Sequence, residues 1–221
     1  MVETFWVVRH AEREDNTNRS WHRSKATNPR QLAPDNSPLS ARGRRQADEL
    51  GKQFTKIPIN HVFASPFDRT IETATRLIGD REIPIKVEPG LAEALYLCEK
   101  PPGFQTPEEL KKIYPLVDLS YDPIFRPPLP SEGCGDDACT RRVRRTLEEI
   151  IERYASADNV VLVGHGASIG AVHEVLVGDW NYVGQATISK FEADTQNRRK
   201  FRLVYSSDAS HLSDKTNLRP Y

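Results

Sequence analysis

The sequence is poor in cysteine, carries no excess charge and has no long apolar run. Its 221 residues include three cysteines, an odd number too small for a disulfide framework, and no Cys-x-x-Cys pair for a structural zinc site. Lys and Arg total 31, as do Asp and Glu, so the global basic field of a nonspecific nucleic-acid binder is absent. No apolar stretch approaches the roughly 20 residues of a membrane span. We therefore expect neither nucleic acid nor membrane as a partner.

The start of the chain and its length favour one cytoplasmic, globular domain. Residues 2–8 are too short an apolar run, with the wrong flanks, for a signal peptide. A chain of 221 residues can bury a substantial core without disulfide or metal crosslinks. We expect a single domain over residues 1–221 in a reducing, cytoplasmic setting, with any anion site built by local gathering of basic residues.

Hydrophobic patterning predicts alternating strands and helices. Short β-rich runs predict strands at 5–8, 62–64, 83–87, 159–163, 187–191 and 201–205. Apolar residues at helical spacing predict helices at 40–54, 65–79, 108–113, 136–154 and 168–176. Strands separated by helices indicate an α/β sandwich of three layers, with a mostly parallel central sheet and helices on both faces. The segments 14–38 and 91–135 are irregular insertions in this pattern.

Three short motifs follow predicted strands directly. Arg9-His10 follows the first strand, Ser65-Pro66 through Arg69 follows the second, and Gly164-His165-Gly166 follows the strand at 159–163. Ligands of such sheets bind beyond the carboxyl ends of the strands. The sequence therefore predicts that two histidines and an arginine meet at one sheet edge.

These residue types suit the transfer of a phosphoryl group. Arginine binds two phosphate oxygens at once through its planar fork and keeps its charge, and Arg9, Arg13 and Arg69 offer three such forks. Cationic neighbours lower the pKa of a histidine, which keeps His10 neutral and nucleophilic near neutral pH. The pattern favours His10 as the nucleophile of a phosphatase.

The same motifs resemble a known family. Val8-Arg9-His10-Ala11-Glu12-Arg13 is similar to the Arg-His-Gly signature of the histidine phosphatase superfamily, which includes the phosphoglycerate mutases. The segment 65–74 resembles its Ser-Pro-x-x-Arg-x-x-x-Thr-Ala helix start, and Gly164-His165-Gly166 its second histidine. The Arg-His-x-Glu-Arg form and the segments 62–66 and 87–93 look most like the phosphatase domain of the Sts/TULA proteins, which contain ubiquitin-associated and SH3 domains.

The resemblance implies a phosphoglycerate mutase-like fold and a role for each matching residue. His10 would become a phosphohistidine, without a metal or another cofactor. The phosphoryl oxygens would be held by Arg9, Arg13, Arg69 and His165. Glu93 would protonate the leaving alcohol and then activate water, although Glu88 and Glu99 are close in sequence and remain alternatives. A homodimer is implied only by analogy with the Sts/TULA domain.

The substrate is left open by the sequence. We expect the segments 14–38 and 91–135 to form the substrate rim, because both are inserted between elements of the phosphate site. A phosphotyrosine protein and a small phosphate ester both fit this expectation. Ala11 stands where the family has glycine, a change that should be tolerated unless the position needs a positive φ.

Other functions would use some of the same residues. A phosphomutase and a catalytically inactive phospholigand-binding module would need the same arginines. A metallohydrolase is not favoured, because the sequence contains no His-x-His or His-Glu-x-x-His pairing of metal ligands. The spacing from Cys139 to Arg145 fits cysteine-dependent phosphatases, but it falls in a predicted helix whose backbone N–H groups are already bonded. We interpret the basic run Arg141–Arg145 as a solvated helix face.

Overall fold

Six strands form one mixed sheet in the computed structural model, which describes residues 2–154, 159–197 and 200–220. The strands are β1 (Thr4–Arg9), β2 (His61–Ala64), β3 (Ile85–Val87), β4 (Asn159–Gly164), β5 (Ile188–Ala193) and β6 (Phe201–Asp208). Their order is β3-β2-β4-β1-β5-β6, and the first four are parallel. β5 and β6 are antiparallel to the sheet strands that they pair with. The predicted α/β class with a mostly parallel sheet is confirmed.

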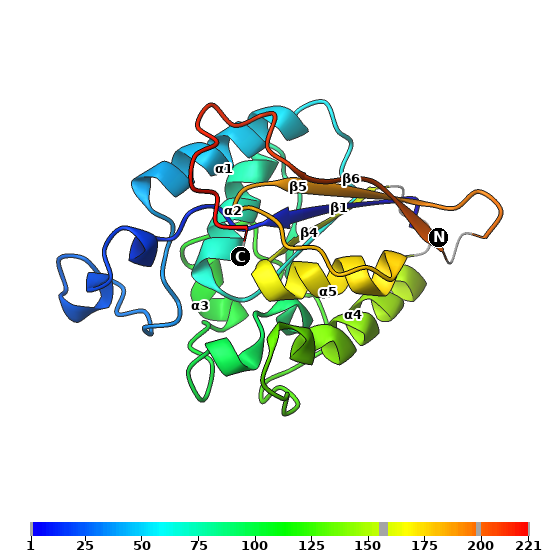
Figure 1. Cartoon of the computed structure of the whole chain (residues 1–221). Coiled ribbons are helices and arrows are strands. Elements are labelled where there is room, and N and C mark those ends of the chain that lie inside the picture. The colour runs from blue at the N-terminus through cyan, green and yellow to red at the C-terminus, as the bar shows by residue number, and fades with distance from the viewer. Residues whose placement is uncertain (1, 155–158, 198–199, 221) are drawn as a thin grey trace.

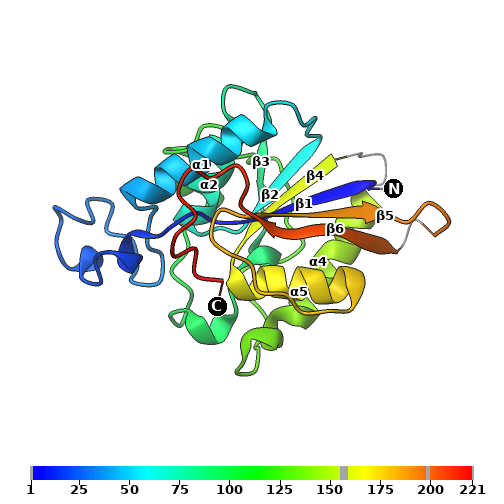
Figure 2. The same ribbon diagram turned by 45° about the horizontal axis from the view of Figure 1, so that its top comes forward.

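Helices cover both faces of this sheet. They are α1 (Ala41–Phe54), α2 (Asp68–Ile78), α3 (Pro107–Lys111), α4 (Thr140–Arg153) and α5 (Gly166–Val177). Figures 1 and 2 show α1 and α2 on one face and α4 and α5 on the other. Among the described residues, no helix is both long enough and apolar enough to cross a bilayer.

The central strand β1 contributes side chains to both hydrophobic cores, because successive side chains point to opposite faces of the sheet. Trp6 and Val8 pack in the core beneath α1 and α2, whereas Phe5 and Val7 pack in the core above α4 and α5. All four are at most 9% exposed. A strand buried on both faces reads as a continuous apolar run, which explains why the sequence signal here is so clear.

Several predicted element boundaries shift in the structure, among them those of β3, α2 and α5. The strand predicted at 83–87 spans only Ile85–Val87, since Pro84 has no N–H to give to a ladder. The helix predicted from Ser65 begins at Asp68, whose backbone N–H donates to Oδ1 of Asn36 at 2.8 Å. The helix predicted from Ser168 begins two residues earlier, directly after His165. Its first turn therefore faces the sheet edge where the motifs end.

Candidate active site

The carboxyl ends of three neighbouring strands bring the predicted motifs together. Arg9 pairs with Gly164 in the register of β1 and β4, and Ala64 pairs with Val163 in that of β2 and β4. The backbone N–H of His10 then donates to the carbonyl of Gly164 at 3.0 Å. As a result, the rings of His10 and His165 lie edge to face, with centroids 5.3 Å apart.

The imidazole of His10 is buried and held in one tautomer. Its Nδ1–H donates a hydrogen bond to the carbonyl oxygen of Ala11 at 2.8 Å, which places the ring proton on that nitrogen. Burial lowers the pKa of His10 well below 6.5, and the guanidiniums of Arg69, Arg9 and Arg13 lower it further. The ring is therefore neutral, with a lone pair on Nε2. Ala11 is absent from the described non-glycine residues with positive φ, so alanine is tolerated there.

His165 is engaged through both ring nitrogens. Its Nδ1 accepts a hydrogen bond from Nη2 of Arg69 at 3.1 Å, and its Nε2 donates to Oγ of Ser65 at 2.7 Å. Burial, followed by the charge of Arg69, lowers the pKa of His165 well below 6.5. In this arrangement His165 orients Arg69, and a direct bond from His165 to a phosphoryl oxygen stays a prediction.

Two arginines of the cleft lining, the buried Arg69 and the half-buried Arg9, are held by backbone carbonyls. Nη1 of Arg9 donates to the carbonyl of Val183 at 2.7 Å, and Nη1 of Arg69 donates to that of Asp35 at 2.9 Å. Burial lowers the pKa of each guanidinium to about 10, so both keep their charge at neutral pH. The Nε–H groups of both are buried without an acceptor among the described residues. Such donors fit an anion between them.

Arg13 is closer to solvent than the other two arginines. Its Nε lies 2.9 Å from Oδ1 of Asp15, and the side chains are 31% and 26% exposed. Arg13 still lines the cleft beside Arg9 and Arg69.

The structure separates the three candidate carboxylates. Glu93 lines the cleft, and its Oε1 accepts the backbone N–H of Ala94 and that of Ala167, each at 3.1 Å. Ala167 lies in the first turn of α5, so the start of this helix orients the carboxyl group of Glu93. Glu88 is fully buried and bound by the hydroxyl of Tyr121 and by three backbone N–H groups, so it stabilises the loop rather than facing the cleft. Glu99 lines the outer part of the cleft.

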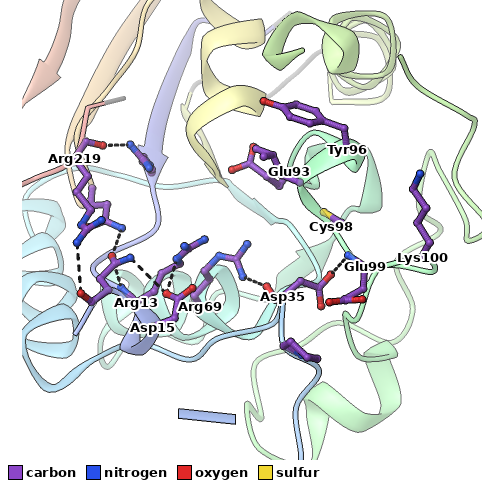
Figure 3. Close-up of a pocket in the computed structure, with 15 residues that line it drawn as sticks. Arg13, Asp15, Asp35, Arg69, Glu93, Tyr96, Cys98, Glu99, Lys100 and Arg219 are labelled. Atoms are coloured by element: carbon purple, nitrogen blue, oxygen red, sulfur yellow. Dashed lines mark hydrogen bonds and ion pairs between the residues drawn. The ribbon is translucent and has the colours of Figure 1, made fainter. Parts of the chain in front are cut away.

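The three arginines line a cleft of about 850 Å³ together with Glu93 and Glu99, whereas the buried His10 and His165 are not part of its lining. Figure 3 shows Glu93 and Tyr96 on one side of it, opposite Arg13 and Arg69. The cleft receives residues from both inserted segments, 14–38 and 91–135. Asp35 links these two segments, because its Oδ2 accepts the backbone N–H of Glu99 at 2.9 Å and that of Gly103 at 3.1 Å.

Two site residues were missed by sequence reasoning. The carbonyl of Arg219 accepts Nη1 of Arg9 at 2.5 Å, and its side chain lines the cleft. Figures 1 and 2 both place this C-terminal segment, in red, beside the start of α5. The solvated face predicted for Arg141–Arg145 is wrong for Arg142, which is only 4% exposed and donates to the carbonyl of Glu93 at 3.0 Å. Neither contact has a signal in the local sequence.

Cys139 and the arginines after it do not form an anion-binding loop. Arg141–Arg145 lie within α4, as predicted, and Cys139 directly precedes that helix. Burial raises the pKa of the Cys139 thiol to about 12, which keeps it protonated and unreactive at neutral pH. In the described part of the chain, no three His, Cys, Asp or Glu side chains group as metal ligands.

Acid is expected to destabilise the fold through His10 and His165. Each imidazole takes up a proton near pH 6.5 in the unfolded chain, whereas in the folded chain the lowered pKa keeps it neutral. Below that pH the unfolded state binds more protons, so the free energy of unfolding falls by up to about 1.4 kcal/mol per pH unit for each histidine. Chemical denaturation from about pH 7 to about pH 5 should show a smaller slope for His10→Asn than for the wild type. An unchanged slope contradicts a buried, neutral imidazole.

Comparison with known proteins agrees with this geometry. The chain is 31% identical over 150 residues to the ecdysteroid-phosphate phosphatase of Bombyx mori, and the aligned region covers 63% of this chain and 22% of that protein. It is 30% identical over 156 residues to the ubiquitin-associated and SH3 domain-containing protein A of Homo sapiens, covering 64% and 23%. The chain thus matches less than a quarter of the length of either relative.

A solved structure and a family model extend the similarity to most of the chain. The crystal structure of the ecdysone phosphate phosphatase of Bombyx mori in complex with tungstate matches with a TM-score of 0.68 at 22% identity, covering 93% of each chain. The model of the histidine phosphatase superfamily (branch 1) matches residues 5–203. This protein therefore belongs to branch 1 of the histidine phosphatase superfamily.

Proposed function

We propose that this protein hydrolyses phosphate monoesters in two steps and that His10 carries the phosphoryl group between them. The supporting observation is the meeting of a neutral, buried imidazole with the guanidiniums of Arg9 and Arg69. The buried Nε–H groups of both arginines have no acceptor in the described part of the chain, and phosphoryl oxygens would supply one. Phosphoryl transfer depends on such positioned cations more than on covalent help from the protein.

The first step forms a bond between Nε2 of His10 and phosphorus while the bond from phosphorus to the ester oxygen breaks. The Nδ1–H of His10 keeps its hydrogen bond to the carbonyl of Ala11, which stabilises the positive charge that develops on the ring. The leaving oxygen takes a proton from Glu93, which enters this step in its acid form. The arginines balance the charge on the transferred phosphoryl group.

The second step releases phosphate. Glu93, now a carboxylate, takes a proton from a water molecule, and the water oxygen bonds to phosphorus while the bond to Nε2 of His10 breaks. The products are inorganic phosphate, a neutral His10 and a Glu93 that is ready for another cycle. This order follows the switch of one residue from acid to base that microscopic reversibility requires.

Relatives with different substrates support the reaction class more than any one substrate. They include an ecdysteroid-phosphate phosphatase and an adenosylcobalamin/alpha-ribazole phosphatase, both named for small phosphate esters, as well as the ubiquitin-associated and SH3 domain-containing protein. A particular closeness to the Sts/TULA domain is therefore a proposal. Phosphotyrosine and a small phosphate ester are equally supported as substrates by these relatives. A mutase-like relative, a probable phosphoglycerate mutase, keeps the phosphomutase as the alternative.

A substrate panel tests this proposal. Phenyl phosphate, phosphotyrosine and 3-phosphoglycerate are each incubated with the protein, and phosphate release is measured beside the formation of 2-phosphoglycerate. We expect phosphate release from at least one aryl ester and no mutase reaction that outpaces it. Faster interconversion of the phosphoglycerates would establish the mutase, and binding without turnover would establish an inactive module.

A further inference from the structure

An apolar groove opens beside the catalytic cleft and shares a wall with it. Its volume is about 390 Å³, which is within the range of small-molecule sites. Its apolar lining comes from two proline-rich stretches of the 91–135 segment and includes Leu95, Pro101, Phe104, Pro127, Pro128 and Leu129. Three residues line both the groove and the cleft: Tyr96, Glu99 and Lys100. A molecule anchored in the cleft can therefore extend into the groove.

The groove lies on the side from which the leaving group departs. Glu93 and Tyr96 stand together on one side of the cleft, opposite Arg13 and Arg69 (Figure 3). In the proposed reaction the ester oxygen faces Glu93, because Glu93 protonates it. The chain then turns through a short helix at Leu95–Leu97, in which Leu95 lines the groove, Leu97 lines the cleft and Tyr96 lines both. The organic part of a substrate is thus directed toward the groove.

The groove offers no uncompensated charge beyond the wall that it shares with the cleft, among the described residues that line it. Glu132 belongs to the lining, but its side chain is only 5% exposed and its Oε1 lies 2.6 Å from Nε of Arg142. Its Oε2 accepts the backbone N–H of Leu95 at 3.0 Å. Beyond the shared wall, a charged leaving group would lose water without gaining an ionic partner, whereas an apolar group gains by leaving water.

We propose that this groove binds the organic part of the substrate, and that the substrate is a small phosphate monoester of a bulky, apolar alcohol or phenol. The proposal rests on the proposed phosphatase function. Prolines in the lining have little conformational freedom to lose, so the site is largely preformed. One further ring buried in the groove should raise kcat/KM by about tenfold.

A pair of aryl esters of similar leaving-group acidity tests the groove. We expect kcat/KM for 2-naphthyl phosphate to exceed that for phenyl phosphate by about tenfold. Leu129→Asp should remove this advantage, and measurable turnover of phenyl phosphate reports that the variant folds. Leu119→Asp is the matched control, because Leu119 is 51% exposed and lies outside the groove lining. Leu129→Ala, a milder change, should reduce the advantage in part.

The outcomes separate the groove from the catalytic proposal. If the wild type hydrolyses neither ester, the phosphatase function itself fails. If the wild type has the same kcat/KM for both esters, the groove is not a substrate site. The same conclusion follows if Leu129→Asp and Leu119→Asp lower kcat/KM for both esters by equal factors. A phosphotyrosine peptide with a higher kcat/KM than 2-naphthyl phosphate would assign this surface to a protein substrate and overturn the proposal.

A second, independent observation concerns the loop that carries Glu93. Nη1 of Arg142 donates to the carbonyls of Gly90 and Ala92 at 2.8 and 3.0 Å, and Nη2 donates to that of Glu93 at 3.0 Å. Glu132, the ion-pair partner of Arg142, binds the backbone on the other side of Glu93. The ion pair of Arg142 and Glu132 therefore binds the backbone of this loop on both sides of the proposed acid.

We infer that Arg142 is a positioning residue, which holds the carboxyl of Glu93 at the leaving oxygen through the backbone of this loop. Lysine cannot replace it, because an ammonium lacks the planar fork that serves three carbonyls and a carboxylate at once. Burial of such a pair gives little net stability, so geometry is its better explanation.

The dependence of kcat on the leaving group distinguishes positioning from mere stability. Arg142→Lys should lower kcat about tenfold or more for esters of poor leaving groups and leave 4-nitrophenyl phosphate nearly unchanged, since a good leaving group needs no acid. Arg144→Lys, an exposed position on the same helix, is the control. An equal loss with every ester, or no loss at all, overturns the inference.

Discussion

Replacing His10 with alanine should reduce the turnover of any phosphate monoester by at least about 10⁴-fold, as expected for removal of a nucleophile. The imidazole is buried with Nδ1 bound to the Ala11 carbonyl, so Nε2 is its only nitrogen free to attack phosphorus. No other described histidine can replace it, because both ring nitrogens of His165 are engaged. Steady-state kinetics with an aryl phosphate measures the effect.

His61→Ala is a suitable control for this substitution. His61 begins β2 and therefore lies at the amino end of a strand whose carboxyl end borders the site. The same change of residue type, at the opposite edge of the sheet, should leave kcat/KM within about twofold of the wild-type value, as for a position outside the site. If His10→Ala retains turnover within tenfold of wild type, the nucleophile is another group.

Glu93→Gln should produce the second-largest effect, and that effect should depend on the leaving group. Glutamine keeps an oxygen that can accept the N–H groups of Ala94 and Ala167, so the loop stays in place while the transferable proton is lost. For an alkyl phosphate, which needs protonation of a poor leaving group, we expect kcat to fall by about 10²–10⁴-fold. For 4-nitrophenyl phosphate the loss should be far smaller.

Glu99→Gln provides the matched comparison, because Glu99 lines the same cleft and is the other carboxylate exposed there near Glu93 in sequence. Measuring kcat against leaving-group acidity for both variants assigns the acid. A steeper dependence for Glu93→Gln alone supports the assignment. A steeper dependence for Glu99→Gln, or a uniform loss for Glu93→Gln, moves the acid elsewhere.

Local pattern predicts this fold well because its elements are set by local features. β1 and β4 are apolar on both faces, and α4 presents a clear apolar stripe, so the strands and helices follow from periodicity. The order of the motifs along the chain then predicts the shared sheet edge, since parallel strands end at the same side. The meeting of His10 and His165 follows from this topology alone.

The contacts that the sequence could not predict are those made across long separations. Asn36 caps α2 from 32 residues away, and the tail residue Arg219 reaches Arg9 across 210 residues. Arg142 looks like part of a solvated basic face because its partners are carbonyls about 50 residues earlier. The choice between Glu88 and Glu93 depends in the same way on distant contacts, because Glu93 lines the cleft whereas Glu88 is bound by Tyr121 and by the backbone at 124–125.

Chemical trapping of the phosphorylated protein is the most direct measurement. The wild type is mixed with phosphate-labelled substrate and denatured during turnover, and the stability of the bound label is compared in acid and in alkali. We predict a label that is lost in acid, survives alkali, maps to His10 and is absent from His10→Ala. A label that survives acid, or one that persists in His10→Ala, would contradict transfer through this imidazole.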